Sequence, residues 1–411
     1  MRTLYLMAFA AAIGSPLFAG ATSRSGFTTL YKFVGSSAGQ TPQGLVAGPN
    51  GVLYGTTAYG GTYGFGTVFE LQPPAAPGGT WTETVIYNFT GENSDGKNPF
   101  ASPTLGANGS LYGTTTYGGY YGSGAAYELQ PPSDPGGAWT EMVLFSFVDT
   151  DNGGSGFYPY ERVVIGNNGE LYGATSGGGI YYFGAIFELA PPAAPGGTWT
   201  ESVIYSFTGD GREPVGLTMG ANGVLYGATA YGGGSGAGTV FELMPPSASG
   251  GTWSAIVLYT FSGGADGVAP LQPPVIANNG TLYGTTSGGG STGAGTVFAL
   301  TPGQGGIWTK TVLYDFANSG DGKIPDSPLV LRSNAIYGTT ATGTGAQNAG
   351  GSVFELRKTA GGAWTETVLH DFAGAAGPYG SFVMDKSGAI YGATTSGPGP
   401  TGAGMVYKIV P

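Results

Sequence analysis

Short apolar segments alternate with Gly-rich polar turns along almost the whole chain, and one of these segments recurs seven times. It reads LYGTT where it first occurs, and its tyrosine returns every 54 to 60 residues. The seven copies are Leu53–Thr57, Leu111–Thr115, Leu171–Thr175, Leu225–Thr229, Leu282–Thr286, Ile336–Thr340 and Ile390–Thr394. A period of this length predicts an array of small units, each of which buries its apolar faces only against its neighbours.

Each unit contains four such segments. In the first unit they are Gln43–Ala47, Leu53–Thr57, Gly66–Leu71 and Trp81–Phe89. Five of the seven units place Asn-Gly between the first two segments, which is a strong hairpin signal because both residues tolerate positive φ. No segment shows the 3.6-residue period of a helix. The pattern therefore predicts an all-β fold, a seven-bladed β-propeller of four-stranded antiparallel blades.

The two ends of the chain indicate how the ring closes. Phe27–Phe33 matches the fourth segment of the repeat, although it precedes the first complete unit, and the last segment, Met405–Ile409, matches the third. We therefore expect the N-terminal strand to close the last blade, which pairs both ends and removes an exposed sheet edge. A stacked solenoid is the alternative, but it would need atypical capping units at both ends.

Two rare residue types have packing interpretations. All six tryptophans stand at the start of the fourth segment, so we interpret them as contacts between blades; they are Trp81, Trp139, Trp199, Trp253, Trp308 and Trp364. The single histidine, His370, takes the position that Tyr87 and Tyr314 hold in other units. It therefore replaces a packing tyrosine and gives no basis for a Ser-His-Asp relay.

The first 21 residues have the anatomy of a secretory signal peptide. A positive start at Met1 and Arg2 precedes the apolar run Leu4–Ile13, and Ala19–Ala21 forms a small-residue cleavage site. The run is too short to span a bilayer, and no later stretch reaches 18 apolar residues. We expect a signal peptide at 1–21 and a single propeller domain at 22–411, located in the periplasm, at the cell surface or in the medium.

Composition narrows the function classes. Gly (82) and Pro (28) are abundant, but 13% aromatic residues indicate ordered β structure rather than disorder. Charged residues make up 9%, and the net charge of −11 disfavours nucleic acid and anionic membranes as partners. No cysteine is present, so disulfides and thiolate metal sites are excluded, and one histidine excludes a histidine cluster. We expect a monomer without a cofactor.

In the segments LYGTT, GTVFEL and VIYNF and in its Gly-Gly turns, the chain resembles the GloVer tandem-repeat family, proteins of the choice-of-anchor type with secretion signals. The resemblance covers about residues 27–411. The repeat is also similar to the sensor propellers of two-component regulators, which carry an aromatic-containing strand before Gly-Gly. The resemblance implies an exported repeat protein, sometimes anchored to the cell surface, and it implies no particular chemistry.

Aromatic residues are concentrated in one kind of loop. In a four-stranded meander, the loop after the second strand and the loop between blades emerge on the same face. In the first four units the former loop holds the ligand-binding candidates Tyr59, Tyr63, Tyr117, Tyr120, Tyr121, Tyr181, Tyr182 and Tyr231. Such rings suit stacking on sugars or contact with a peptide. The alternative is that they cover the loops locally.

Asp-Gly before proline recurs in the loops between blades, at Asp95, Asp210, Asp266 and Asp321. Turn formation explains the pair, since Asp bonds its own backbone and Gly takes positive φ. A ring of carboxylates could also bind Ca²⁺, the one metal we consider. The candidates are Asp149 and Asp151, in a segment similar to a calcium loop but with Gly153 at its fifth position.

Glu161 and Arg162 break the repeat, since other units place Gly, Ser, Pro or Val at these positions of the first segment. We expect both to line the central channel, with Arg162 as a ligand-binding residue. Glu161 and Asp326 could form the carboxyl pair of a glycoside hydrolase. The favoured function is nevertheless a non-enzymatic exported protein that binds a glycan or protein ligand through its aromatic loops. The alternatives are a polysaccharide-active enzyme and a purely structural surface protein.

Overall fold

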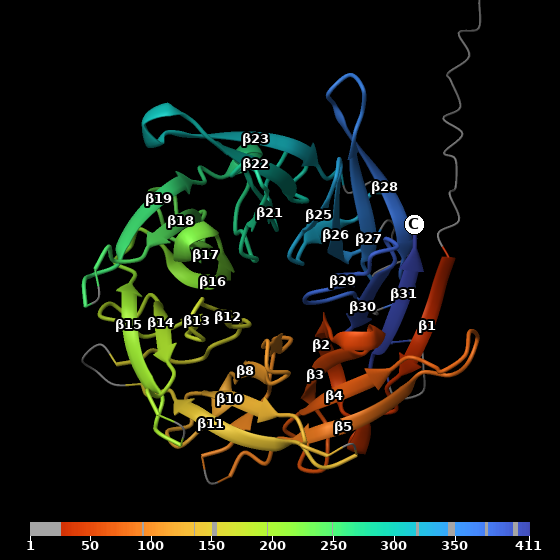
Figure 1. Cartoon of the computed structure of the whole chain (residues 1–411). Helices are drawn as coiled ribbons and strands as arrows, with labels where there is room; N and C mark the ends of the chain where they lie inside the picture. Colours follow the sequence, from red (N-terminus) through yellow and green to blue (C-terminus); the bar gives the residue numbers. More distant parts are fainter. Residues whose placement is uncertain are drawn as a thin grey trace, which may run out of the picture.

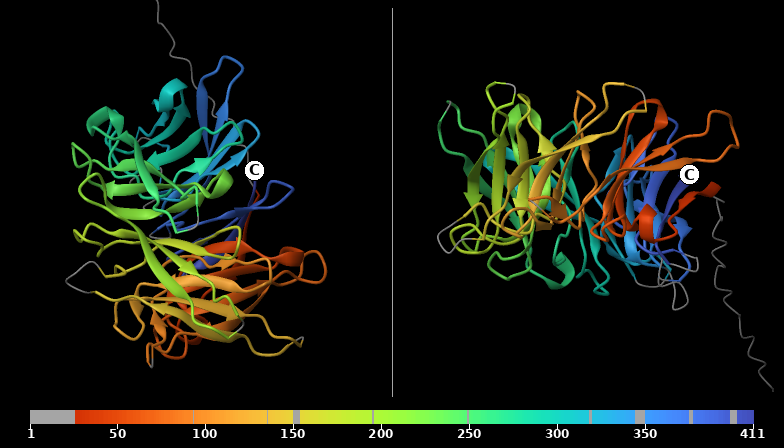
Figure 2. Two further views of the ribbon diagram at one scale, coloured as in Figure 1. Left: turned by 60° about the vertical axis from the view of Figure 1, so that its left-hand side comes forward. Right: turned by 90° about the horizontal axis from the view of Figure 1, so that it is seen from below.

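Seven antiparallel sheets form a closed ring in the computed structural model (Figure 1). The structure describes residues 26–92, 94–134, 136–149, 154–194, 196–248, 250–317, 320–343, 350–374, 377–397 and 402–411. The side view shows a single ring of blades, with loops projecting from both faces (Figure 2). The predicted seven-bladed β-propeller is confirmed. The proposed signal peptide at 1–21 lies outside the described residues.

The blades follow one another in chain order, each with its first strand nearest the centre. Blades 1 to 3 are β2(Gln40–Ala47)–β3(Leu53–Tyr59)–β4(Thr67–Gln72)–β5(Thr82–Asn88), β7(Thr104–Leu105)–β8(Leu111–Thr115)–β10(Ala125–Gln130)–β11(Thr140–Ser146) and β12(Val164–Ile165)–β13(Leu171–Thr175)–β14(Ala185–Ala190)–β15(Thr200–Ser206). Blades 4 and 5 are β16(Arg212–Met219)–β17(Leu225–Tyr231)–β18(Thr239–Met244)–β19(Ser254–Thr260) and β20(Val275–Ile276)–β21(Leu282–Thr286)–β22(Thr296–Pro302)–β23(Trp308–Asp315).

Blade 6 splits its innermost strand into two pieces, giving β24(Lys323–Pro325) and β25(Val330–Arg332) beside β26(Ala335–Thr342)–β27(Ser352–Lys358)–β28(Trp364–Asp371). Blade 7 consists of β29(Val383–Met384)–β30(Ile390–Thr394)–β31(Met405–Val410), closed by β1(Gly26–Lys32). β1 pairs antiparallel with β31 from Gly26 opposite Val410 to Lys32 opposite Met405. The predicted closure by the N-terminal strand is therefore confirmed.

Short connecting elements complete the fold. The ribbon β6(Gly96–Lys97)–β9(Tyr117–Gly118) joins a loop between blades to a loop within blade 2. The 3₁₀ turns are η1(Ser36–Ala38), η2(Pro49–Gly51), η3(Ala221–Gly223), η4(Gly264–Asp266) and η5(Gln304–Gly306). The Asn-Gly pairs lie at the predicted hairpins, and both residues have positive φ at Asn50-Gly51 and Asn222-Gly223. The described part of the chain contains no helix with the length and hydrophobicity of a membrane span.

Aromatic rings join each blade to the next. The aromatic residue of the third strand, such as Phe241, contacts the ring that follows the outer strand of the preceding blade, here Phe207, with centroids 5.2 Å apart. The other six pairs have centroids 4.9 to 5.3 Å apart, and they are Phe33–Phe69, Phe89–Tyr127, Phe147–Phe187, Phe261–Phe298, Phe316–Phe354 and Phe372–Tyr407. These buried rings form the core of every blade boundary.

The tryptophans and His370 pack as the repeat predicts. Each tryptophan contacts the LYGTT tyrosine of the preceding blade or packs in the same cluster, for example Trp253 with Tyr172 at 5.5 Å between ring centroids. His370 stacks on Phe27 of the closing strand at 3.9 Å, with the two rings almost parallel. Burial lowers the pKa of His370. Its role is packing between blades 6 and 7.

Carboxyl groups of the outer strands lie half-buried at several blade boundaries. Glu366, on β28, faces Tyr314 and Asp321 of the preceding blade and its connecting loop. Burial and the charge of Asp321 raise the pKa of Glu366 to about 8. The equivalent Glu141 has its pKa raised to about 7 by burial and by Asp95. One oxygen of each carboxyl has no hydrogen-bond partner among the described residues.

Lys310 takes the same position on the outer strand of blade 5, so this boundary has a cation where those of Glu141 and Glu366 have a carboxyl group. Its ammonium lies 2.8 Å from Asp266 Oδ1 and above the rings of Tyr259 and Phe261. Burial alone would raise the pKa of Asp266, but hydrogen bonds from Lys310, Ser262 and Tyr259 bring it down to about 2. The boundary between blades 4 and 5 therefore pairs Lys310 with Asp266. The boundary between blades 5 and 6 instead brings two carboxyl groups together, those of Glu366 and Asp321.

We predict that the fold becomes less stable as pH rises from about 5 to about 9. Below pH 4.5 the Glu366 carboxyl is protonated in both the folded and unfolded states, whereas at higher pH only the unfolded state ionises freely until the folded pKa is reached. Glu366→Gln should flatten this pH dependence, and Glu366→Lys should raise the alkaline melting temperature by about 1–3 °C through an ion pair with Asp321. Thermal melts across this pH range measure both effects.

The control is Glu92→Gln, because Glu92 is exposed in a loop between blades. Its melting temperature should follow that of the native chain at every pH. A Glu366→Gln variant with the native pH dependence would show that this carboxyl does not influence stability.

Candidate functional site

The loops that follow the second strands and the segments that join the blades lie on one face, which we call the loop face. Backbone hydrogen bonds connect the two, from Asn98 N to Phe65 O at 2.8 Å, from Tyr158 N to Ser123 O at 3.0 Å and from Glu213 N to Phe183 O at 2.9 Å. The expectation that both kinds of loop share a face is thus confirmed. The opposite, hairpin face carries the Asn-Gly turns.

A proline in each connecting segment determines which residues reach the channel. The residue before it has a positive φ in six blades, as at Tyr158 (57°) and Glu213 (54°), although neither is glycine. The three residues after the proline then pass along the channel wall. All the described residues that line the inner cavity of the channel come from these tripeptides, and they include Gln43, Phe100, Glu161, Arg162, Gln272 and Tyr379.

Hydroxyl groups of blade 2 hold the segment that carries Glu161 and Arg162. Thr114 Oγ1 donates a hydrogen bond to the Glu161 carbonyl at 2.9 Å, and Thr104 and Thr116 donate in the same way to Val163 and Pro159. On the other side, Gly216 of blade 4 lies so close that an added Cβ would approach the Glu161 Cβ and Cγ to 3.2 Å. Strand β12 begins only at Val164, so the two residues precede the innermost strand rather than lying on it as predicted.

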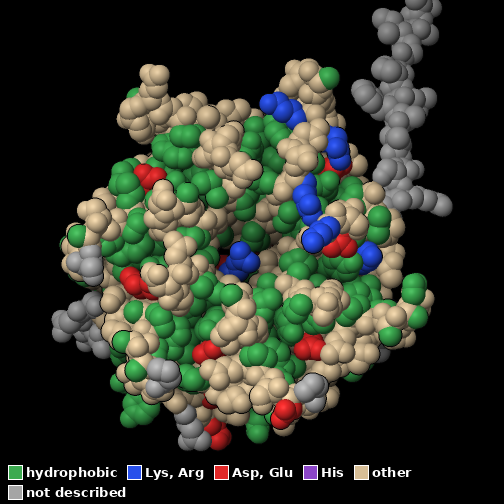
Figure 3. All heavy atoms as spheres, in the orientation of Figure 1, with side chains coloured by type: hydrophobic (Ala, Val, Ile, Leu, Met, Phe, Trp, Pro, Cys, Tyr) green, Lys and Arg blue, Asp and Glu red, His purple; other side chains and the backbone are tan. Residues whose placement is uncertain are grey.

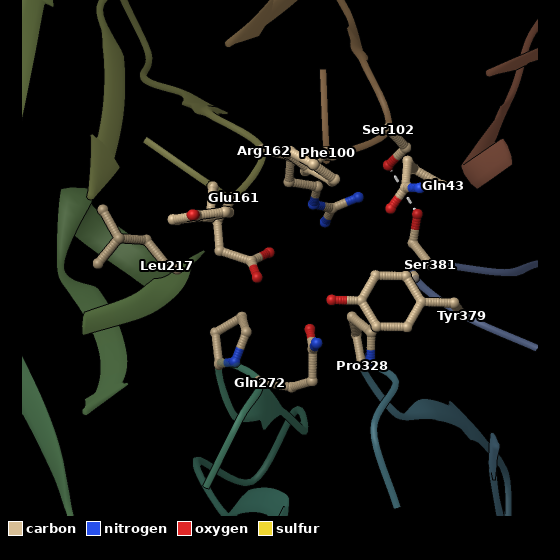
Figure 4. Close-up of a pocket in the computed structure, with 15 residues that line it drawn as sticks. Gln43, Phe100, Ser102, Glu161, Arg162, Leu217, Gln272, Pro328, Tyr379 and Ser381 are labelled. Atoms are coloured by element: carbon tan, nitrogen blue, oxygen red, sulfur yellow. Dashed lines mark hydrogen bonds between the residues drawn. The ribbon is translucent and has the colours of Figure 1, made fainter. Parts of the chain in front are cut away.

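Two adjoining cavities open around this segment. The inner one, of about 210 Å³, lies within the channel, and the outer one, of about 590 Å³, extends toward the loop face over blades 3 and 4. Both are lined by Tyr160, Glu161, Gln272 and Tyr379. In Figure 4 the polar ends of Glu161, Arg162, Gln272 and Tyr379 point toward one another across the inner cavity. The outer cavity is further lined by Phe157, Tyr158, Ser176, Tyr182, Glu213, Tyr231 and Asp326.

The two carboxyl groups of the site favour their protonated forms. Burial, together with the charge of Asp326, raises the pKa of Glu161 to about 8, although Arg162 acts in the opposite direction. Burial raises the pKa of Asp326 to about 7. Glu161 nevertheless keeps some contact with solvent in the channel, since the protein surrounds the side chain without sealing it off. Near neutral pH the site therefore contains carboxyl groups that can donate as well as accept hydrogen bonds.

Arg162 and Tyr379 complete the polar part of the site. The surrounding protein lowers the pKa of Arg162, but the side chain is still exposed to solvent in the channel, and it remains a cation because an unperturbed guanidinium titrates far above neutral pH. Burial and the nearby charges of Asp326 and Glu161 raise the pKa of Tyr379, so its hydroxyl remains a donor. Arg162 is the only Lys or Arg among the residues lining the two cavities. Figure 3 shows a positively charged side chain at the central hollow of the ring.

The tyrosines predicted as ligand contacts are all exposed, but they do not form one cluster. Tyr182 and Tyr231 line the outer cavity, next to Tyr158 and Tyr160. Tyr59 and Tyr117 connect to them through ring contacts, Tyr59 to Phe100 to Tyr160 and Tyr117 to Tyr158, with centroids 5.2 to 5.9 Å apart. The remaining candidates line neither cavity, namely Tyr63, Tyr120, Tyr121 and Tyr181.

Sequence reasoning missed Tyr158, Tyr160, Gln272 and Tyr379. All four lie within three residues of the proline that enters the blade. Alignment of the seven units on that proline would have found them.

The recurring Asp-Gly aspartates serve their own turns, as predicted. Asp95 accepts hydrogen bonds from the Thr90 and Gly96 backbone amides at 2.6 Å, and Asp266 accepts one from Ser262 N at 2.7 Å. Of the two calcium candidates, Asp149 is exposed and Asp151 lies outside the described residues. No group of three or more acidic, histidine or cysteine side chains that could hold a metal occurs within the described part of the chain.

The repeat itself identifies the family. The family model described as the Gloeobacter/Verrucomicrobia repeat matches residues 14–241 and 236–411, which together cover nearly the whole chain. The chain belongs to this repeat family. The resemblance inferred from the LYGTT and GTVFEL segments is thus confirmed. No protein with a curated description matches the chain.

Solved structures with the same architecture share little sequence with this family member. The extracellular domain of the putative one component system BT4673 from B. thetaiotaomicron has 9% identity and a TM-score of 0.53, with 92% of this chain and 39% of that chain covered. An ulvan lyase of polysaccharide lyase family PL25 has 12% identity and a TM-score of 0.52, with 94% of each chain covered. The same lyase bound to -[GlcA(1-4)Rha3S]- also has a TM-score of 0.52. At these identities the likeness shows the propeller fold alone.

We predict that Asp326→Asn lowers the pKa of Glu161. The charge of Asp326 is one of the two causes that raise it, so its removal should let Glu161 ionise at lower pH. Carbon-13 NMR of carboxyl-labelled glutamate, recorded across a pH series, follows this titration. Asp385→Asn is the control, since Asp385 lies on a hairpin of blade 7 and does not contribute to the Glu161 shift. An unchanged titration in Asp326→Asn would leave burial as the sole cause.

Proposed function

We propose that this protein binds a glycan on its loop face, with part of the sugar chain entering the channel between blades 3 and 4. The observation that carries this proposal is the outer cavity of about 590 Å³, where six aromatic rings surround a few polar groups. Sugar rings have apolar faces that stack on aromatic side chains and hydroxyl edges that need hydrogen-bond partners. The cavity offers both.

Further aromatic rings could extend the contact beyond the cavity. The ring contacts from Tyr59 through Phe100 to Tyr160 form a path from the loops of blade 1 to the channel. Tyr117 and Tyr158 form a second contact over blades 2 and 3. An elongated surface of this kind suits a polymer, since successive sugar units can stack on successive rings. Export from the cytoplasm is part of the proposal, and it is supported by the signal-peptide pattern of residues 1–21.

The rings of the outer cavity should contribute most of the affinity. Tyr158→Asn, Tyr182→Asn and Tyr231→Ala should each weaken glycan binding by about threefold to tenfold, and the triple variant should abolish it. Asparagine replaces the first two because Tyr158 and Tyr182 have positive φ, which asparagine tolerates well. A glycan array with the mature protein identifies the ligand, and calorimetry then gives the affinities.

Two controls locate the effect. Ile307→Ala removes an exposed apolar side chain between β22 and β23, on the hairpin face, and should change nothing. Tyr120→Ala with Tyr121→Ala tests the exposed tyrosines outside the cavities. Loss of binding only in this last variant would move the site away from the channel, and binding of a protein but of no glycan on the array would reject the glycan proposal.

Glycan cleavage is a second candidate, favoured by the carboxyl pair. Glu161 and Asp326 line the same outer cavity, and the charge of Asp326 helps to raise the pKa of Glu161 to about 8. Hydrolysis of a glycosidic bond needs one carboxyl that gives a proton and one that acts as base or nucleophile. The ulvan lyase with the same fold acts on a polysaccharide, although a lyase cleaves by elimination and not by hydrolysis.

If the protein is such an enzyme, release of reducing ends from a polysaccharide panel should disappear in both Glu161→Gln and Asp326→Asn. The variant Glu92→Gln should retain the native rate, because Glu92 is exposed and lines neither cavity. Absence of release by the native protein would reject this candidate and leave the binding function in place.

A further inference from the structure

Arg162 has an environment that lacks an anionic partner. Its guanidinium points into the inner cavity (Figure 4), and no described residue forms an ion pair or accepts a hydrogen bond with it. The adjacent Glu161 favours its neutral form, so it does not supply a full negative charge at neutral pH. A guanidinium carries five N–H donors in a planar fork that fits a carboxylate or sulfate. In this channel those donors face open space.

The groups around Arg162 are mostly donors as well. Near neutral pH Glu161 carries a proton, and the Tyr379 hydroxyl remains protonated because its pKa is raised by burial and neighbouring charges. The Gln272 amide donates to the Asp326 carbonyl at 3.2 Å and also hydrogen-bonds the Asp326 carboxyl. Donors from blades 3 and 7 thus converge on one small cavity and match a ligand group that accepts hydrogen bonds, although Gln43 Oε1, which is unpaired within the described part of the chain, also lines the cavity.

We propose that the inner cavity binds an acidic group of the glycan, the carboxylate of a uronate or a sulfate ester, with Arg162 as its counter-ion and Glu161 as a hydrogen-bond donor. This inference rests on the proposed glycan-binding function and names the class of sugar. The net charge of −11 opposes an acidic ligand at long range. Arg332, Arg357, Lys358 and Lys386 lie at hairpins on the opposite face, so the attraction for an acidic group has to come from Arg162 within the channel.

Binding of the acidic group should weaken as pH rises. The titratable groups around Glu161 are Tyr160 and Arg162 on its own segment, Asp326 from blade 6 and Tyr379 from blade 7, and Glu213 lines the adjoining cavity. Below the pKa of Glu161, its proton can be donated to the bound anion. Above that pKa, both Glu161 and Asp326 are negative and repel the anion, whereas Arg162 and Tyr379 keep their protons.

The test compares matched oligosaccharides by calorimetry at about pH 6 and about pH 9. The probes are oligouronates of galacturonate, glucuronate and mannuronate, the same oligomers with their carboxylates reduced to alcohols, and sulfated galactan oligomers beside their desulfated forms. At pH 6 at least one acidic oligomer should bind about tenfold or more tightly than its neutral partner, because hydrogen bonds to charged groups are the strong ones. The preference should shrink at pH 9. The uronate and sulfate arms distinguish the two sources of charge.

Single substitutions assign the effect to residues. Arg162→Gln should remove the preference for the acidic oligomer and leave the affinity for its neutral partner unchanged. Glu161→Gln keeps a neutral donor at all pH values, so it should retain the preference and lose most of its pH dependence, with Asp326→Asn removing the rest. Arg332→Gln is the matched charge control, because Arg332 is exposed on a hairpin and should leave the preference intact.

The outcomes separate this inference from the proposed function. Equal affinity for acidic and neutral oligomers, or a preference that survives Arg162→Gln, overturns the acidic-group site while glycan binding stands. If neither acidic nor neutral oligomers nor any glycan on the array binds, the proposed function itself fails.

Discussion

One contact, repeated seven times, determines the geometry of the ring. The aromatic ring of each third strand lies across the glycine of the neighbouring LYGTT strand and meets the ring that ends the outer strand of the preceding blade. The glycine is required, because a Cβ at Gly227 would come within 2.3 Å of Phe241 Cζ, and a Cβ at Gly55 within 2.5 Å of Phe69 Cζ. Since every boundary contains the same pair, the angle between blades is set by packing and not by the loops, which are then free to vary.

The aromatic pairs fix the ring without help from the residues that line the channel. The lining can therefore differ from blade to blade, and the site is asymmetric although the fold is symmetric. The second residue after the inner proline has to pass close to its neighbours, and most blades place a small residue there, as at Gly44, Ala101 and Gly216. Blades 3 and 5 place Glu161 and Gln272 instead. These two side chains extend into the channel, where the rest of the ring leaves room for them. Two of the polar groups of the site are therefore the large residues at this position, Glu161 and Gln272. The small residues at the same position in the other blades leave the space that they occupy.

The sequence was sufficient for the architecture, because the periodic segments and the incomplete unit at each end leave one consistent way to close the ring. It was also sufficient to single out Glu161 and Arg162, since both interrupt the repeat. It did not reveal Tyr379 or Gln272 as their neighbours. Those residues belong to blades 7 and 5, and their approach depends on innermost strands only two residues long, which leave most of the channel wall to irregular segments. Strand periodicity carries no information about such segments, whereas the position of the proline does.

Carboxyl groups with shifted pKa values often mark functional sites. In this chain, those at a position that recurs from blade to blade can be distinguished from one that does not recur. Glu141 and Glu366 have raised pKa values, yet they occupy one recurring position on the outer rim, where Lys310 replaces them in another blade without loss of the fold. A position that tolerates either sign of charge serves packing between blades. Glu161 has no counterpart of its type in any other unit, and it faces a cavity rather than a blade boundary. The same shift in pKa therefore accompanies packing at the rim, whereas in the channel it supports the proposed ligand site.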